Sequence, residues 1–213
     1  MPIQSKICGI TTPEALDAAL SGGASHVGFV FFPKSPRNIS IANTQALLKK
    51  LPQSVKSVAL VVDPEAEFID TLMRDLPGLT ALQFHGDEPP NRLAGLRGQG
   101  LEIWKAVPIR TQADLMKAAD YKGAADYILY DAKPPKGADL PGGTGQRFDW
   151  TLLQGVRHPL PWILAGGLDA HNLAEARQMT GADFFDVSSG VESAPGIKDV
   201  DKIAAFLKAA SNL

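Results

Sequence analysis

A cysteine and an aspartate, far apart in the sequence, stand where a base and an acid could act on one substrate. Cys8 lies in the run Lys6-Ile7-Cys8-Gly9, and Asp131 directly follows the apolar run 128–130. A thiol can act as a general base when its surroundings acidify it, and a carboxyl group can donate a proton to a substrate oxygen. Each residue alone is also compatible with a structural role, as a buried cysteine or a loop aspartate.

The sequence places more polar side chains on the same faces of the predicted strands. Because side chains alternate along a strand, Lys6 shares a face with Cys8, and Gln83 shares a face with His85. We expect Lys6 to support the site electrostatically and His85 to hydrogen-bond or polarise a substrate. His85 and Asp87 do not indicate a metal site, since the three other histidines show no ligand spacing around them.

Three further segments carry groups that bind anions. Arg37 stands between a proline and a predicted helix start, and its guanidinium fork suits a carboxylate, although a single loop arginine is commonly solvated. Two glycine-rich loops follow the last two predicted strands. They could be tight turns only, but phosphate sites in barrels of parallel strands recur in these two loops. The candidate phosphate residues are Gly166, Gly167, Ser188, Ser189 and Gly190, with Asp186 nearby.

These residues need a fold that brings the ends of several strands together. Apolar runs alternate with helical segments, which predicts a parallel sheet with right-handed crossovers. Eight such units predict a single (β/α)8 TIM-barrel domain over residues 1–213, with its site at the carboxyl ends of the strands. An open doubly wound sheet is the alternative, but no Gly-x-Gly-x-x-Gly follows the first strand. The apolar runs are Ser5–Ile10, His26–Phe31, Val55–Val62, Leu79–Phe84, Leu101–Val107, Tyr127–Tyr130, Trp162–Ala165 and Phe184–Val187.

The sequence also indicates where helices begin and end. Thr12-Pro13-Glu14 is typical of a helix start, and Gly22-Gly23 of its end. A second helix is predicted from Ser40 to Leu51, where apolar residues recur at helical spacing. A short helix over Phe148–Gln154 is the least defined. The long loop Lys133–Gly145, rich in proline and glycine, is typical of an active-site element.

Composition argues against several classes of function. The formal net charge of −2 and the sequence pI of about 6.1 give no support for binding nucleic acid or a membrane surface. The apolar runs are far too short to span a bilayer, and we expect no signal peptide. With one cysteine, no intrachain disulfide can form, so we expect a cytoplasmic protein. No long apolar stripe is left over after the core is assigned, so we expect a monomer.

Taken together and in order, these segments closely resemble the phosphoribosylanthranilate isomerase family of tryptophan biosynthesis. The resemblance covers nearly the whole chain, and the combination of segments is specific although each alone is not. The family often has leucine where Ile10 and Phe84 stand, and Phe84 should point away from the site. The matching segments are 6–11, 28–31 with 35–37, 83–86, 131 with 142–145, 164–168, and 186–192 with 196–199.

The resemblance implies an Amadori rearrangement, in which N-(5-phosphoribosyl)anthranilate becomes 1-(2-carboxyphenylamino)-1-deoxyribulose 5-phosphate. Asp131 would protonate the furanose ring oxygen, and Cys8 would remove the C2 proton. Arg37 would hold the anthranilate carboxylate, and the two glycine-rich loops would hold the phosphate. Since only protons move, the resemblance implies neither a cofactor nor a metal. The remaining pocket residues would be Gln83, His85 and Asp186.

Other phosphosugar barrels are the nearest alternatives. A pentose-phosphate epimerase would want an acid pair and a metal, and an indole-glycerol-phosphate synthase would want a catalytic lysine and an N-terminal extension. A non-catalytic barrel that binds a phosphorylated ligand would keep the glycine-rich loops but would not need Cys8 with Asp131. Some related barrels also isomerise a histidine-pathway intermediate, usually with paired aspartates, so Cys8 favours the anthranilate substrate alone.

Overall fold

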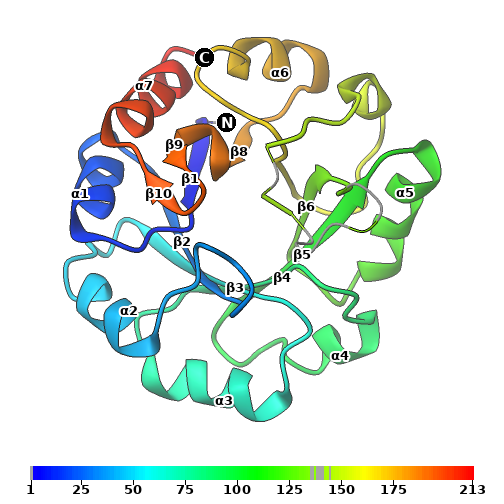
Figure 1. The fold of residues 1–213 in the computed structure, drawn as a ribbon. Coiled ribbons are helices and arrows are strands. Elements are labelled where there is room, and N and C mark those ends of the chain that lie inside the picture. Colours follow the sequence, from blue (N-terminus) through cyan, green and yellow to red (C-terminus); the bar gives the residue numbers. More distant parts are fainter. Residues whose placement is uncertain (1, 135–136, 138–141, 144) are drawn as a thin grey trace.

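The computed structural model describes residues 2–134, 137, 142–143 and 145–213. Eight parallel strands close into a barrel in the order β1 to β8, and β8 pairs with β1. Helices surround the barrel (Figure 1), so the predicted TIM barrel is confirmed and the open sheet is excluded. The strands are β1 Gln4–Cys8, β2 His26–Phe31, β3 Lys56–Val61, β4 Ala81–Phe84, β5 Glu102–Ile109, β6 Tyr127–Ala132, β7 Trp162–Leu164 and β8 Phe184–Val187.

The helices lie between the strands in the chain. Between β6 and β7, however, the described residues form only the 3₁₀ turn η2, Trp150–Leu153, in place of the helix predicted over Phe148–Gln154. Within the described part of the chain, no helix is both long enough and apolar enough to cross a membrane. The other helical elements are α1 Pro13–Ser21, α2 Ile41–Leu48, α3 Ala66–Asp75, α4 Pro90–Ala94, α5 Gln112–Met116, η1 Lys117–Tyr121, α6 Leu173–Thr180, η3 Ser189–Val191 and α7 Val200–Ser211.

Side-chain caps fix the helix starts that the sequence predicted. The Thr12 hydroxyl accepts a hydrogen bond from the backbone N–H of Ala15 at the start of α1, and the Ser40 hydroxyl caps α2 in the same way. Gly22 ends α1 as predicted. The second helix stops at Leu48, three residues before the predicted end, because the chain turns there toward β3.

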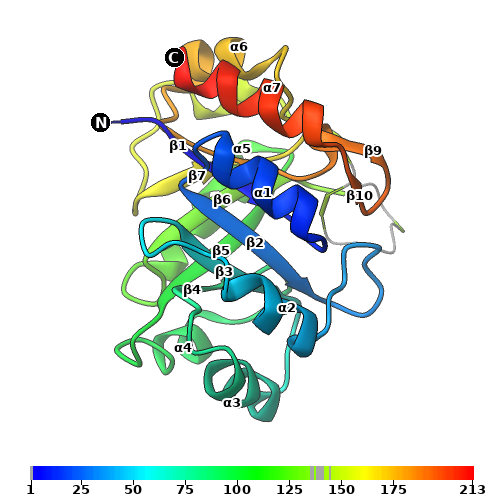
Figure 2. The same cartoon turned by 90° about the vertical axis from the view of Figure 1, so that its left-hand side faces the viewer.

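A small antiparallel hairpin interrupts the regular pattern after β8. It consists of β9 Glu192–Ala194 and β10 Ile197–Lys198. Figure 2 shows this hairpin on the side toward which the barrel strands run, with both chain termini on the other side. The hairpin therefore stands at the end of the barrel where the site was expected. The long loop predicted there, Lys133–Gly145, lies partly outside the described residues, at 135–136, 138–141 and 144.

Two apolar clusters fill the molecule. The larger lies between the strands and the helices and contains Phe84, which therefore points away from the barrel interior, as predicted. The smaller fills the amino-terminal end of the barrel, where the His26 ring packs at 5.4 Å from Trp104 and 4.7 Å from Phe184, centroid to centroid. Burial and the positive charges of Lys56 and Lys6 lower the pKa of His26 to about 3.

The His26 environment predicts a loss of stability in acid. Between pH 6.5 and pH 3, His26 is protonated in the unfolded chain but stays neutral in the folded chain. The unfolded state therefore binds more protons, and the free energy of unfolding falls as pH drops through this range. Each pH unit in this window costs about 1.4 kcal/mol. Urea unfolding of His26→Gln should therefore lose about 2 kcal/mol less than wild type between pH 7 and pH 5.

The exposed His171 provides the matched control. His171→Gln should show the same pH dependence of the unfolding free energy as wild type. If His26→Gln also kept the wild-type pH dependence, the assignment of the acid sensitivity to His26 would be wrong.

Candidate active site

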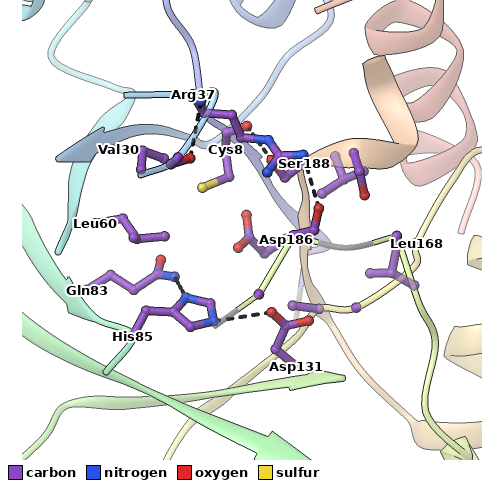
Figure 3. A pocket seen from close by; sticks show the side chains of 18 of the residues that line it. Cys8, Val30, Arg37, Leu60, Gln83, His85, Asp131, Leu168, Asp186 and Ser188 are labelled. Carbon is purple, nitrogen blue, oxygen red and sulfur yellow. Dashed lines mark hydrogen bonds and ion pairs between the residues drawn. The ribbon is translucent and has the colours of Figure 1, made fainter. Parts of the chain in front are cut away.

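A pocket opens at the carboxyl ends of the strands, where the sequence predicted the site. Figure 3 shows the sulfur of Cys8 and the carboxyl group of Asp131 reaching into it from opposite sides. Cys8 ends β1 and Asp131 lies near the end of β6, so the two candidates for base and acid share one cavity. Every predicted site residue except Gly190 lines this pocket: Cys8, Arg37, Gln83, His85, Asp131, Gly166, Gly167, Asp186, Ser188 and Ser189.

A buried ion pair lies beside Cys8. The Nζ atom of Lys6 donates to Oδ1 of Asp186 at 3.0 Å, and the Lys6 side chain has no exposed surface. The two residues are register partners in β1 and β8, so both side chains enter the barrel interior. Burial raises the pKa of the Asp186 carboxyl group, against the lowering effect of the Lys6 ammonium. Lys6 therefore lies inside the barrel on the same face of β1 as Cys8, as the alternation of side chains predicted, and its electrostatic role stays a prediction.

The charges of Lys6 and Asp186 also act on the Cys8 thiol. Only 3% of the Cys8 surface is exposed, and the Ser188 hydroxyl donates to the Cys8 carbonyl oxygen at 3.1 Å. Burial raises the pKa of the thiol, while the nearby Lys6 ammonium acts to lower it. The thiol therefore needs a cation in contact with it before it can act as a thiolate.

The Asp131 carboxyl group contacts one backbone N–H group and one ring nitrogen. Its Oδ1 accepts from the Ala132 backbone at 2.8 Å, and its Oδ2 lies 3.2 Å from Nε2 of His85. The Gln83 amide nitrogen lies 3.4 Å from Nδ1 of His85 (Figure 3). Donation from the Gln83 amide to Nδ1 requires the His85 tautomer that carries its proton on Nε2, the ring nitrogen next to Asp131. The three side chains stand in contact in the order Gln83, His85 and Asp131 along one wall of the pocket.

Gln83 also keeps one acceptor free. Its side chain is fully buried, and its Oε1 atom has no hydrogen-bond partner among the described residues. A buried amide oxygen without a partner is costly, and this one belongs to a residue that lines the pocket. The oxygen can therefore accept a hydrogen bond from a bound molecule.

Arg37 already holds a carboxylate of this chain. Its Nε and Nη2 atoms donate to the two oxygens of Glu192 at 2.7 Å and 2.8 Å, and Nη2 also donates to the carbonyl of Gly143 at 3.1 Å. Arg37 is only 5% exposed, so the interpretation as a solvated loop residue is wrong. Because Glu192 occupies the fork, the guanidinium presents Nη1, for which the described residues offer no acceptor.

Lys198 shares the carboxylate of Glu192 with Arg37. It donates to Oε1 of Glu192 at 2.9 Å and to the Ser188 carbonyl at 2.8 Å. The two cations lower the pKa of Glu192 although burial opposes them, and two positive charges around one carboxylate leave an excess positive charge at this rim. No role was predicted for Glu192 or Lys198 from the sequence; their one signal was the match to the family segments 186–192 and 196–199.

The two glycine-rich loops pack against each other. A Cβ atom on Gly190 would lie only 1.9 Å from the carbonyl oxygen of Leu168, so a side chain there would push the loops apart. Gly190 therefore shapes the wall rather than lining the pocket. The backbone N–H groups of Gly166 and Gly167 have no acceptor among the described residues, and both glycines line the pocket. They remain available as donors to an anion.

A family model and the sequences of known relatives match this chain under the same enzyme name. Residues 5–209 match the family model described as N-(5'phosphoribosyl)anthranilate (PRA) isomerase. The N-(5'-phosphoribosyl)anthranilate isomerase of Zymomonas mobilis subsp. pomaceae is 49% identical over 98% of each chain. The enzyme of the same name from Rhodospirillum centenum is 50% identical over the whole of both chains.

Solved structures of the same name share the fold. The phosphoribosyl anthranilate isomerase of Thermotoga maritima has a TM-score of 0.88 at 36% identity, covering 99% of this chain and all of the other. A complex of such an isomerase with reduced 1-(o-carboxyphenylamino)-1-deoxyribulose 5-phosphate has a TM-score of 0.85 at 34% identity, with the same coverage. Another Thermotoga maritima structure is of monomers generated from a dimeric isomerase, so the expected monomeric state of this chain stays a prediction.

The matches in sequence and in structure cover almost the whole length of this chain. They point to the same family as the order of the motifs and the closed barrel. The chain therefore belongs to the N-(5'-phosphoribosyl)anthranilate isomerase family, the TIM-barrel isomerases of tryptophan biosynthesis.

Proposed function

We propose that this chain converts N-(5-phosphoribosyl)anthranilate to 1-(2-carboxyphenylamino)-1-deoxyribulose 5-phosphate with Asp131 as general acid and Cys8 as general base. The observation that carries this assignment is that a thiol and a carboxyl group from β1 and β6 reach into one pocket from opposite sides. That arrangement suits proton transfers at two different atoms of a single small substrate. The single cysteine fits a reducing cytoplasm as the place of action.

In the acid step, protonated Asp131 gives its proton to the furanose ring oxygen. The bond between that oxygen and C1 breaks, and the nitrogen lone pair forms the open-chain iminium. Asp131 becomes a carboxylate, which keeps the hydrogen bond from the Ala132 N–H and lies 3.2 Å from His85 Nε2. Because these two groups already stand next to the oxygens, they would stabilise the charge that develops on Asp131 without rearrangement of the site.

In the base step, the Cys8 thiolate removes the proton from C2. The electron pair of the C–H bond flows to the iminium nitrogen, which is the electron sink, and an enolamine forms. The enolamine becomes the ketone when C1 takes up a proton and the C2 hydroxyl loses one, so the isomerisation is balanced. The proposed series of steps therefore needs one general acid and one general base.

Two anionic groups of the substrate can orient it between Cys8 and Asp131. The anthranilate carboxylate would meet Nη1 of Arg37, at a rim with an excess positive charge from Arg37 and Lys198. The phosphate would accept hydrogen bonds from the free N–H groups of Gly166 and Gly167 and from Ser189. Positioning of this kind can contribute several kcal/mol to lowering the barrier.

Removal of the proposed base should stop the proton transfer but not binding. Cys8→Ala should lower kcat by about 10²–10⁴-fold and leave KM nearly unchanged, because the anion-binding groups stay in place. Steady-state kinetics that follow the loss of substrate fluorescence measure both constants. Cys8→Ser keeps the size of the side chain and should lose as much, since a hydroxyl is a far weaker base at neutral pH. Near-normal turnover of Cys8→Ala would exclude Cys8 as the base.

Removal of the proposed acid should be comparably damaging. Asp131→Asn preserves shape but cannot donate a carboxylic proton, so kcat should fall by about 10²–10⁴-fold. Asp87→Asn, a change at an exposed carboxylate next to the β4 end, is the matched control and should keep the wild-type kcat. A mild effect of Asp131→Asn on kcat would refute the acid assignment.

Loss of the cation at the rim should weaken binding. Arg37→Ala should raise KM by about 10- to 100-fold, which corresponds to one lost hydrogen bond between charged groups. Lys34→Ala removes an exposed positive charge from the same loop and should leave KM unchanged. Thermal unfolding of Arg37→Ala separates a loss of binding from a loss of fold. An unchanged KM in a folded Arg37→Ala protein would mean that another group holds the carboxylate.

A further inference from the structure

Lys6 and Cys8 meet beside a glycine of the neighbouring strand. A Cβ atom placed on Gly28 would stand 3.0 Å from Sγ of Cys8 and 3.0 Å from Nζ of Lys6. Gly28 is the register partner of Cys8 in β2, so the missing side chain leaves the space in which the sulfur and the ammonium converge. The same ammonium lies 3.0 Å from Asp186 Oδ1. One cation is thus within reach of two acids.

The enclosure limits how many charges this cluster can hold. Lys6, Cys8 and Asp186 are 0%, 3% and 8% exposed. A buried ion without a partner is strongly unfavourable, so a single ammonium favours one anion beside it and disfavours two. The thiolate of Cys8 and the carboxylate of Asp186 therefore compete for Lys6.

We propose that Lys6 is a positioning residue that controls the protonation of Cys8, and that Asp186 opposes it. When Lys6 binds Asp186, Cys8 rests as a neutral thiol; when Lys6 turns toward the sulfur, the thiolate is stabilised. The use of this thiolate as a base rests on the function proposed above, but the competition itself does not. Neither Lys6 nor Asp186 needs to touch the substrate for this role.

The directions of the electrostatic effects agree with the geometry. Burial raises the pKa of Cys8, Lys6 acts to lower it, and Asp186 acts to raise it. Lys198, on β10, also acts to lower the pKa of Cys8, with less effect than Lys6. The other charged or titratable side chains near this cluster are His26, the register partner of Lys6 in β2, and, around the pocket, Arg37 with Glu192, His85 and Asp131.

The single cysteine makes the proposal directly measurable. The rate of thiol alkylation by iodoacetamide depends on the thiolate fraction, and every alkylated thiol in this chain is Cys8. In the full-length protein, we expect Lys6→Met to shift the midpoint of the rate–pH curve upward by about one pH unit or more. Asp186→Asn should shift it downward, because Lys6 then has the thiolate as its remaining anionic partner. Thiolate absorbance in the ultraviolet gives an independent midpoint.

Lys105→Met is the matched control. Lys105 is also a buried lysine in an ion pair, 3.0 Å from Glu88, but within the described part of the chain it does not line the pocket and makes no hydrogen bond with Cys8. Its substitution should leave the Cys8 midpoint at the wild-type pH. Should Lys6→Met fold poorly because Asp186 loses its partner, the double variant Lys6→Met/Asp186→Asn replaces it, and its midpoint should lie above that of Asp186→Asn.

Opposite shifts are the feature that a merely structural role would not produce. If Lys6 only held the barrel together, Lys6→Met and Asp186→Asn would both speed alkylation at every pH through loosening, without moving the midpoint in opposite directions. Shifts in the same direction, or none, would overturn the proposal. If the shifts occur but Cys8→Ala keeps its turnover, the charge competition stands and the assignment of Cys8 as the base fails.

Discussion

The site depends on one buried ion pair, which joins β1 to β8 where the barrel closes. Lys6 and Asp186 are paired in register between the first strand and the last, and their side chains meet inside the barrel at 3.0 Å. Closure of the ring buries both charges, and breaking one partner of a buried pair is strongly unfavourable. The same pair lies beside the thiol of Cys8. The contact that joins the ends of the sheet thereby also sets the electrostatics of the proposed base.

Among the described residues, the wall of the pocket that carries Asp131 contains no such buried pair of lysine and aspartate. There Asp131 accepts a hydrogen bond from the Ala132 N–H and lies 3.2 Å from Nε2 of His85, which Gln83 contacts in turn. A thiol beside a buried ion pair and a carboxyl group beside a backbone N–H and an imidazole ring have different surroundings, and one catalyst needs such a difference to give a proton at one atom and take one at another. At the rim of the pocket, the Glu192 carboxylate joins two segments of the chain, because it accepts hydrogen bonds from both Arg37 and Lys198.

Much of the fold and part of the site follow from local sequence. The apolar runs predicted eight buried strands, because strands buried on both faces are largely apolar at consecutive positions. The strands His26–Phe31 and Phe184–Val187 have the predicted bounds. The capping residues Thr12 and Ser40 predicted two helix starts. The segment Phe148–Gln154 was the least defined of the predicted helices and was expected to be short, and a 3₁₀ turn over Trp150–Leu153 forms there. The partner of Arg37 could not be predicted, since Glu192 is 155 residues away along the chain.

Division of labour between Asp131 and Cys8 is the central claim, and trapping the open-chain iminium with borohydride tests it most directly. Cys8→Ala should open the ring and stop there, so reduction should yield the trapped amine well above the level formed without enzyme. Asp131→Asn should fail before ring opening and yield only that background. Equal amounts of trapped product from Cys8→Ala and Asp131→Asn would contradict the account, because the two residues would then not act at separate steps.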